Sequence, residues 1–248
     1  MAKPVVLIVG HGSREKAANA QFKTLVRRYA ALRPQYDIDY AFLELTRPHI
    51  GERLEEWASS KREIYILPLF LFAAGHANRD IPRINKAFSE KYPSIKIRMA
   101  NVIGPDPKMA RLATLRALSL KGDPSKTVLL LVGRGAREKR AQQDLRKLAA
   151  WIGKSHRFEK VHPCFYAMAE PDLDKTLKKV VFGGSKSIWL MPYLFFNGDL
   201  VSRIRVKMVK FLRKNKGMTV KISPPLGMHK LLFQVMDARL RQTVEKKV

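Results

Sequence analysis

The sequence contains the same pattern twice. Four segments of the first half return in the same order in the second half, the first two at an offset of 123 residues. The matched pairs are 5–16 with 128–139, 42–48 with 165–171, the stretch around Pro68 with 188–198, and 102–104 with 225–227. The period is much longer than the unit of a solenoid repeat. A tandem duplication therefore predicts two lobes, at residues 1–122 and 123–248.

Each half alternates apolar strands with amphipathic helices. Apolar runs without polar alternation, such as Val5–Val9, are typical of parallel strands that are covered on both faces. The expected strands of the first half span 5–9, 36–43, 63–72 and 95–101, and the expected helices span 15–31, 49–59, 80–91 and 107–120. This alternation predicts an α/β fold. We expect two tandem flavodoxin-like lobes, each with a mainly parallel four-stranded sheet in the order 2-1-3-4, flanked by helices.

Two histidines and a glutamate follow expected strands of the first half. His11 stands between two glycines after the first strand, Glu44 follows the second strand, and His76 follows the third strand after Gly75. Ligands of such sheets bind beyond the carboxyl ends of the strands. The two imidazoles could share one divalent ion, and Glu44 could add a ligand or a proton acceptor. The alternative is that these are loop side chains without a chemical role.

The second half keeps the scaffold and loses these groups. The glycines, the prolines and the apolar strand residues recur in both halves. Arg134, Ala136 and Ala167 stand opposite His11, Ser13 and Glu44, and Asp199 or Leu200 stands opposite His76. Because the residues that can coordinate a metal or carry a proton are lost together, the sequence favours one functional site, in the first half.

The composition restricts the remaining classes. The 48 Lys and Arg outnumber the 21 Asp and Glu, and the net charge of +27 would attract polyanions. The basic residues are spread along the helices, and the sequence shows no base-reading motif. The charge is therefore the only feature that suggests a nucleic-acid-binding protein. The single cysteine, Cys164, excludes a disulfide framework and suits a reducing cytoplasm. No apolar run approaches the length of about 20 residues that spans a membrane.

The ordered motifs resemble those of the class II tetrapyrrole chelatases, and most closely the two-lobed sirohydrochlorin ferrochelatases and cobaltochelatases. The motifs that carry the resemblance are Gly10–Arg14, Phe42–Glu44 with Pro48, Pro68–Leu71 with Gly75 and His76, and Asp80–Pro82. Pieces of the second half at 132–135, 163–165 and 191–194 also resemble the C-terminal lobe of that family. The resemblance covers nearly the whole chain.

This resemblance implies insertion of a divalent metal into sirohydrochlorin without ATP, at a cleft between the lobes. Fe²⁺, which gives siroheme, is the expected metal, and Co²⁺ insertion for cobalamin synthesis is the alternative. The resemblance implies that His11 and His76 hold the metal and accept pyrrole protons. It also implies that the substrate is lined by Arg47, Phe70, Leu71, Phe72, Ala73, Ala74 and Gly75, with Ser13, Arg14, Arg79 and Arg134 as further candidates.

The expected chemistry agrees with these residue types. A metal replaces two N–H protons of the ring, so a base with a pKa near neutrality is needed, and histidine provides one. The carboxylates of the substrate suit arginines at the rim. We expect the metal as a substrate and no permanently bound cofactor, no specific nucleic acid, no membrane, and a monomer because the two lobes are fused. A metal or tetrapyrrole carrier without catalysis is the second hypothesis.

Overall fold

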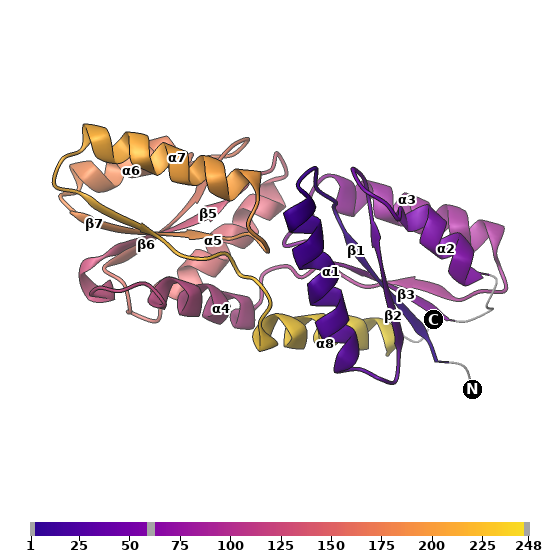
Figure 1. Cartoon of the computed structure of the whole chain (residues 1–248). Helices are drawn as coiled ribbons and strands as arrows, with labels where there is room; N and C mark the ends of the chain where they lie inside the picture. Colours follow the sequence, from indigo (N-terminus) through magenta and orange to yellow (C-terminus); the bar gives the residue numbers. More distant parts are fainter. Residues whose placement is uncertain (1–2, 59–62, 246–248) are drawn as a thin grey trace. The chain divides into compact units, whose positions relative to one another are not determined.

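The computed structural model describes residues 3–58 and 63–245, and for residues 76–78 it describes the backbone alone. The expected end of the second helix at Ser59 lies outside the described residues. The chain separates into two compact units, and Figure 1 shows the elements of each. Unit 1 comprises Met1–Gly104 and Phe233–Val248, and unit 2 comprises Pro105–Leu232.

Unit 1 is built on a parallel four-stranded sheet in the order β2-β1-β3-β4. Its elements are β1 (Val5–Gly10), α1 (Lys16–Ala31), β2 (Asp37–Phe42), α2 (Ile50–Ala58), β3 (Ile64–Pro68), α3 (His76–Lys91), β4 (Ile97–Met99) and most of α8 (Lys230–Val244). The strand β1 is buried along its whole length, as its uninterrupted apolar sequence predicts. The expected fold class and strand order are confirmed.

Helices cover both faces of this sheet (Figure 1). Alternate residues of β1, beginning with Val5, pack with Leu54 of α2 and Ile81 of α3 in one apolar cluster. On the other face, Tyr29 of α1 meets Phe233 of α8 with ring centroids 5.5 Å apart. Both faces of the sheet are therefore closed, and its carboxyl edge is where loop residues can be presented.

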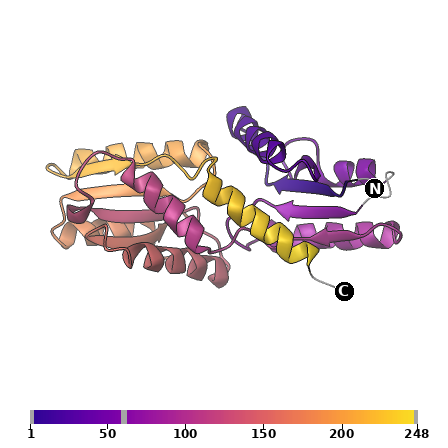
Figure 2. The ribbon, with the colours of Figure 1, turned by 90° about the horizontal axis from the view of Figure 1, so that it is seen from below.

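Unit 2 repeats the architecture in the order β6-β5-β7-β8. Its elements are α4 (Pro107–Leu118), the 3-10 turn η1 (Pro124–Lys126), β5 (Val128–Gly133), α5 (Lys139–Gly153), β6 (Lys160–Phe165), α6 (Leu173–Phe182), β7 (Ser187–Pro192), α7 (Asp199–Lys214) and β8 (Thr219–Ile222). Helices α6 and α7 pack on one face. Figure 2, seen from below, shows α4 lying across the strands of the other face.

The last helix of each repeat belongs to the unit built from the other repeat. Arg116 of α4 donates from Nε and Nη2 to the carbonyl of Leu226, at 2.8 and 2.7 Å, in unit 2. Arg239 of α8 donates in the same way to the carbonyl of Ile103, at 3.1 and 2.6 Å, in unit 1. Both the two arginines and the two carbonyls are 123 residues apart. The compact units thus divide the chain differently from the repeats 1–122 and 123–248, which stay a prediction about the duplication.

Two elements differ from the sequence prediction next to the expected site. The strand β3 ends at Pro68, not at Phe72, because the carbonyls of Phe70 and Leu71 accept hydrogen bonds from the 102–104 loop instead of a neighbouring strand. The helix α3 begins at His76, four residues earlier than expected. Pro82 is a residue of the second turn of α3, whereas a proline is best tolerated in the first turn, which is where the prediction had put it.

No helix within 3–58 or 63–245 combines the length and the apolar character that crossing a lipid bilayer would demand.

Candidate functional site

The histidine that follows β1 lies in a loop whose backbone contacts the loop after β2. The N–H of Leu43 donates to the carbonyl of Gly10, and the N–H of Glu44 donates to the carbonyl of His11. Gly12 has φ +93, and a Cβ there would lie 1.9 Å from the carbonyl oxygen of Glu44. Only glycine fits this contact, so Gly12 brings the two loops together.

The contact between the loops places an imidazole beside a carboxylate. Nε2 of His11 lies 3.1 Å from Oε1 of Glu44, and the side chains are 32% and 40% exposed, respectively. The edge of the Phe70 ring faces the imidazole, with centroids 6.3 Å apart and planes at 72°. A separation of 3.1 Å suits a hydrogen bond, and it also suits two ligands of one metal ion with bonds of about 2.1 Å. The pair can hold a proton or contribute to a cation site, while remaining accessible to solvent.

The second predicted histidine is placed by its backbone alone. His76 is the first residue of α3, directly after Gly75, whose φ is +49. It follows β3, which pairs with β1, so the chain returns to the same carboxyl edge of the sheet. The side chain of His76 lies outside the described residues. Within the part of the chain that the structure describes, no three His, Cys, Asp or Glu side chains gather as a metal site. Shared metal binding by the two histidines therefore stays a prediction.

The segment Phe70–Gly75, predicted to line the substrate, connects β3 to α3 and is half-buried throughout. The carbonyls of Phe70 and Leu71 accept hydrogen bonds from the N–H groups of Ile103 and Gly104, each at 3.0 Å. The carbonyl of Ile103 is in turn held by Arg239. The segment is therefore an anchored loop whose side chains are half open to solvent, including Leu71, Phe72, Ala73 and Ala74.

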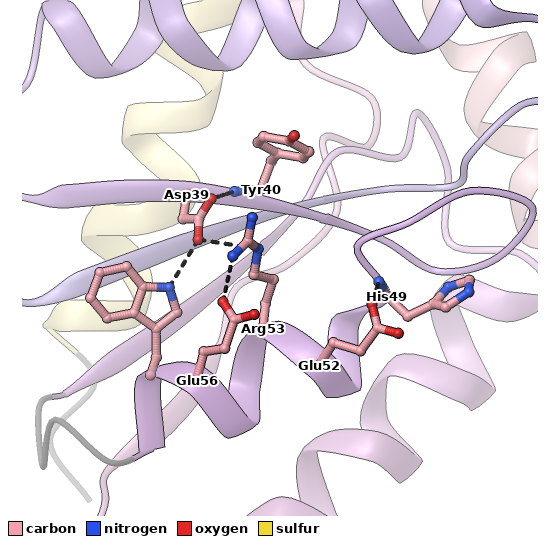
Figure 3. Close-up of polar contacts among 7 residues, drawn as sticks. Asp39, Tyr40, His49, Glu52, Arg53 and Glu56 are labelled. Atoms are coloured by element: carbon pink, nitrogen blue, oxygen red, sulfur yellow. Dashed lines mark hydrogen bonds and ion pairs between the residues drawn. The ribbon is translucent and has the colours of Figure 1, made fainter.

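Arg47 lies on the same loop as Glu44 and is held by α2. Its Nη1 lies 2.6 Å from Oε1 of Glu52, although its side chain is 79% exposed. The other oxygen of Glu52 accepts the N–H of His49 at 2.8 Å, a contact that Figure 3 shows. Glu52 was not among the site residues expected from the sequence. The signal was available, because a glutamate three residues after the residue that precedes a helix is the acidic half of a capping box.

The helix that carries Glu52 is itself tied to the sheet (Figure 3). Asp39 of β2 accepts the indole N–H of Trp57 at 3.0 Å and lies 3.5 Å from Nε of Arg53. Arg53 also pairs with Glu56 one turn further along α2. Because Asp39 and Arg53 are both largely buried, this network fixes how α2 presents its first turn to the loop.

The further candidates take different positions. The hydroxyl of Ser13 accepts the N–H of Glu15 at 3.1 Å, so it supports the start of α1, as a capping role predicts. Arg14 and Arg79 are exposed in unit 1. Arg134 is exposed after β5 in unit 2, at the position equivalent to His11. The structure thus brings together His11, Glu44 and Phe70, and it gives none of these three arginines a described role.

The other titratable candidates have structural surroundings. Burial lowers the pKa of His162 and of His229 below the ordinary value for histidine. Nδ1 of His229 accepts the N–H of Leu231 at 3.2 Å, which caps the start of α8. Cys164 is completely buried in β6, and this burial raises the pKa of its thiol. It packs as a small apolar residue.

The positive charge is concentrated in unit 2, which has no counterparts of His11 and His76. Unit 2 contains 27 Lys and Arg against nine Asp and Glu, a net charge of +18, and unit 1 carries the remaining +9. Helices α6 and α7 contain nine basic and two acidic residues, whereas the equivalent α2 and α3 contain five of each. Because the same scaffold is built with and without this charge, the fold does not require it.

Comparison with known proteins identifies related chains of similar length. The CbiX family model matches residues 5–119 and 128–243. The sirohydrochlorin ferrochelatases of Priestia megaterium and Bacillus subtilis strain 168 are 27% and 26% identical over 98% and 97% of this chain, covering 91% and 92% of those proteins. A sirohydrochlorin cobaltochelatase of Priestia megaterium is 23% identical over 98% of this chain and 81% of that protein.

Solved structures agree with the fold. SirB from Bacillus subtilis with Fe³⁺ superposes with a TM-score of 0.87 at 26% identity, covering 98% of this chain and 96% of that one. SirB from Bacillus subtilis subspecies spizizenii in complex with cobalt gives a TM-score of 0.83 with the same identity and the same coverage. The duplicated two-unit architecture is therefore shared with chains whose solved structures contain Fe³⁺ or cobalt.

Proposed function

The chain belongs to the CbiX family, and from this premise we propose that it is a sirohydrochlorin chelatase. It inserts a divalent metal ion without ATP, and Fe²⁺ is the expected metal. The observation that carries the proposal is that His11 after β1 and Glu44 after β2 lie 3.1 Å apart, whereas their counterparts in the other copy are Arg134 and Ala167. The names of the similar proteins support the same activity.

Insertion exchanges one metal ion for two pyrrole protons. His11, together with His76, holds the incoming ion at the carboxyl edge of the sheet. Glu44 is either a third ligand of that ion, through a carboxylate oxygen, or a proton acceptor. As the ring nitrogens bind the metal, the imidazole and the carboxylate take up the released protons and pass them to solvent, to which both are partly open. No nucleotide is needed, because the bonds to the ring nitrogens replace those to the protein.

The remaining positions bind the macrocycle. The half-buried segment Phe70–Gly75 offers apolar contacts to the ring, and Arg47 offers a guanidinium to its carboxylates. We further propose that the protein acts as a monomer in the cytoplasm, since its repeats are already fused and its one cysteine is reduced and buried.

Insertion of Co²⁺ is the alternative within the same site. Imidazole and carboxylate ligands accept either ion, and a cobaltochelatase is among the similar proteins. Anaerobic incubation of the purified chain with sirohydrochlorin and Fe²⁺ or Co²⁺, followed by absorbance, tests both. We expect insertion above the uncatalysed rate, with Fe²⁺ faster. Tight binding of metal or tetrapyrrole without turnover would instead identify a carrier.

A further inference from the structure

The loop that carries Glu44 is built in the same way in both copies. In unit 1 the N–H of Phe42 donates to the carbonyl of Pro48 at 2.8 Å, and in unit 2 Phe165 donates to Pro171 at 3.0 Å. Each loop also pairs with the loop after the first strand of its sheet, through Glu44 in unit 1 and Ala167 in unit 2. The second copy is thus a control for which features this loop needs.

Both loops adopt a backbone conformation that is unfavourable for their residues. Leu45 has φ +68, and Met168, 123 positions later, has φ +58. Side chains with a Cβ rarely occupy this left-handed region, and they persist there only where surrounding contacts hold them. Each loop therefore needs a restraint from outside itself.

In unit 1 a carboxylate on the helix contacts the end of this loop. Glu52 of α2 binds the guanidinium of Arg47 at 2.6 Å and accepts the N–H of His49 at 2.8 Å. One side chain thus joins the end of the loop to the beginning of the helix.

In unit 2 the acid and the base have exchanged places. Glu170, at the position of Arg47, pairs with Lys175, at the position of Glu52, also at 2.6 Å. The other oxygen of Glu170 accepts the N–H of Asp172, at the position of His49, at 3.1 Å. The ion pair and the bond to the helix N–H are both kept, although every charge is reversed.

We propose that Glu52 is a positioning residue for the His11–Glu44 pair. It acts through Arg47 and His49, which it clamps to α2, and so holds the strained turn on which Glu44 meets His11. The second copy indicates that the clamp requires two opposite charges, of which either can be on the loop. It also requires that the carboxylate accept the N–H of the residue before the helix. The inference rests on the proposed function for its kinetic readout only.

The test uses the charge reversal that the second copy already contains. Glu52→Lys places a second cation beside Arg47. It should lower kcat for metal insertion about tenfold or more, because displacement of the loop that carries Glu44 slows the reaction. The double variant Arg47→Glu/Glu52→Lys reproduces the arrangement of unit 2 and should return the loop to its wild-type position, which is measured by hydrogen exchange and not by kcat, because Arg47 is itself proposed to bind the substrate. A change in KM of the double variant would report separately on the charge at position 47.

A matched control lies in the other copy. Lys175→Glu breaks the equivalent clamp in unit 2, where Ala167 replaces Glu44, and should leave kcat unchanged. Unfolding curves of all variants separate loss of fold from loss of position. The proposal is overturned if Glu52→Lys retains full kcat, or if the amides of the loop exchange as fast in the double variant as in the single one.

A second readout does not depend on catalysis. Amide hydrogen exchange at Glu44 and Thr46 should be faster in Glu52→Lys than in wild type and return to the wild-type rate in the double variant. If the wild type inserts no metal, the proposed function fails while this readout still decides the clamp. Equal exchange rates in all three proteins would contradict it.

Discussion

The imidazole of His11 and the carboxylate of Glu44 lie 3.1 Å apart on two loops whose equivalents in the second copy carry Arg134 and Ala167. The backbone bond between the loops is the same in both copies, at 3.1 Å from Glu44 to His11 and at 3.0 Å from Ala167 to Arg134. The scaffold of the site is therefore independent of its chemistry. Substitutions that copy unit 2 into unit 1 should remove activity without removing the fold.

The first prediction applies this to Glu44. Glu44→Ala installs the residue that unit 2 tolerates, so the midpoint of thermal unfolding should change by no more than about 3 °C, while kcat for metal insertion should fall by about 10- to 1,000-fold as a ligand or proton acceptor is lost. The reciprocal Ala167→Glu should change neither. A fully active Glu44→Ala would remove the carboxylate from the mechanism.

The second prediction concerns the contact at Gly12. Gly12→Ala would place a Cβ 1.9 Å from the carbonyl oxygen of Glu44 at φ +93. The loops must separate, so we expect a loss of about 1–3 kcal/mol in the free energy of unfolding together with a loss of activity. Urea denaturation measures the first effect. Gly51→Ala is the control, because a Cβ there meets nothing within 4 Å in helix α2, and it should stabilise or leave stability unchanged.

The third prediction concerns the helix that closes unit 1. Arg239→Met should lower the free energy of unfolding by about 1–3 kcal/mol, because the carbonyl of Ile103 loses charged donors at 3.1 and 2.6 Å. Arg116→Met should act alike in unit 2, where the donors to Leu226 lie at 2.8 and 2.7 Å. The exposed Arg241 of the same helix serves as the control through Arg241→Met. Equal stability of the Arg239 and Arg241 variants would show that this anchor is dispensable.

The fourth prediction concerns Cys164. Its thiol is completely buried and its pKa is raised by that burial, so the reactive thiolate is scarce and shielded. We expect no labelling by an aromatic disulfide reagent in the native protein and one equivalent per chain in denaturant. Rapid labelling of the native protein would mean that β6 opens readily.

The sequence predicts more of the fold than of the functional site. The repeat and the alternation of apolar strands with amphipathic helices are local patterns, and from them the order 2-1-3-4 followed for both sheets. The same topology predicted that His11, His76 and Glu44 would lie at one edge of the sheet, because the strands that precede them are neighbours, and the structure pairs His11 with Glu44 there. What these side chains do chemically stays a prediction.

The features that were missed depend on contacts distant in sequence. The early end of β3 results from the 102–104 loop, which takes over the carbonyls of Phe70 and Leu71. The exchange of α4 and α8 between the units cannot be predicted from the sequence of either helix, because its apolar face could pack on either sheet. Glu52 could be read as a helix cap, but its pairing with Arg47 became meaningful only beside Glu170 and Lys175.

The most direct test of a single chelatase site is the rate of anaerobic metal insertion into sirohydrochlorin by the wild type and by His11→Arg, which copies Arg134 into the first repeat. We predict insertion by the wild type, and in His11→Arg a folded protein whose rate is at the uncatalysed background. The exposed His156, changed in His156→Asn, is the histidine control and should keep the wild-type rate. Wild-type activity in His11→Arg would contradict the account, because the site would then lie elsewhere in the chain.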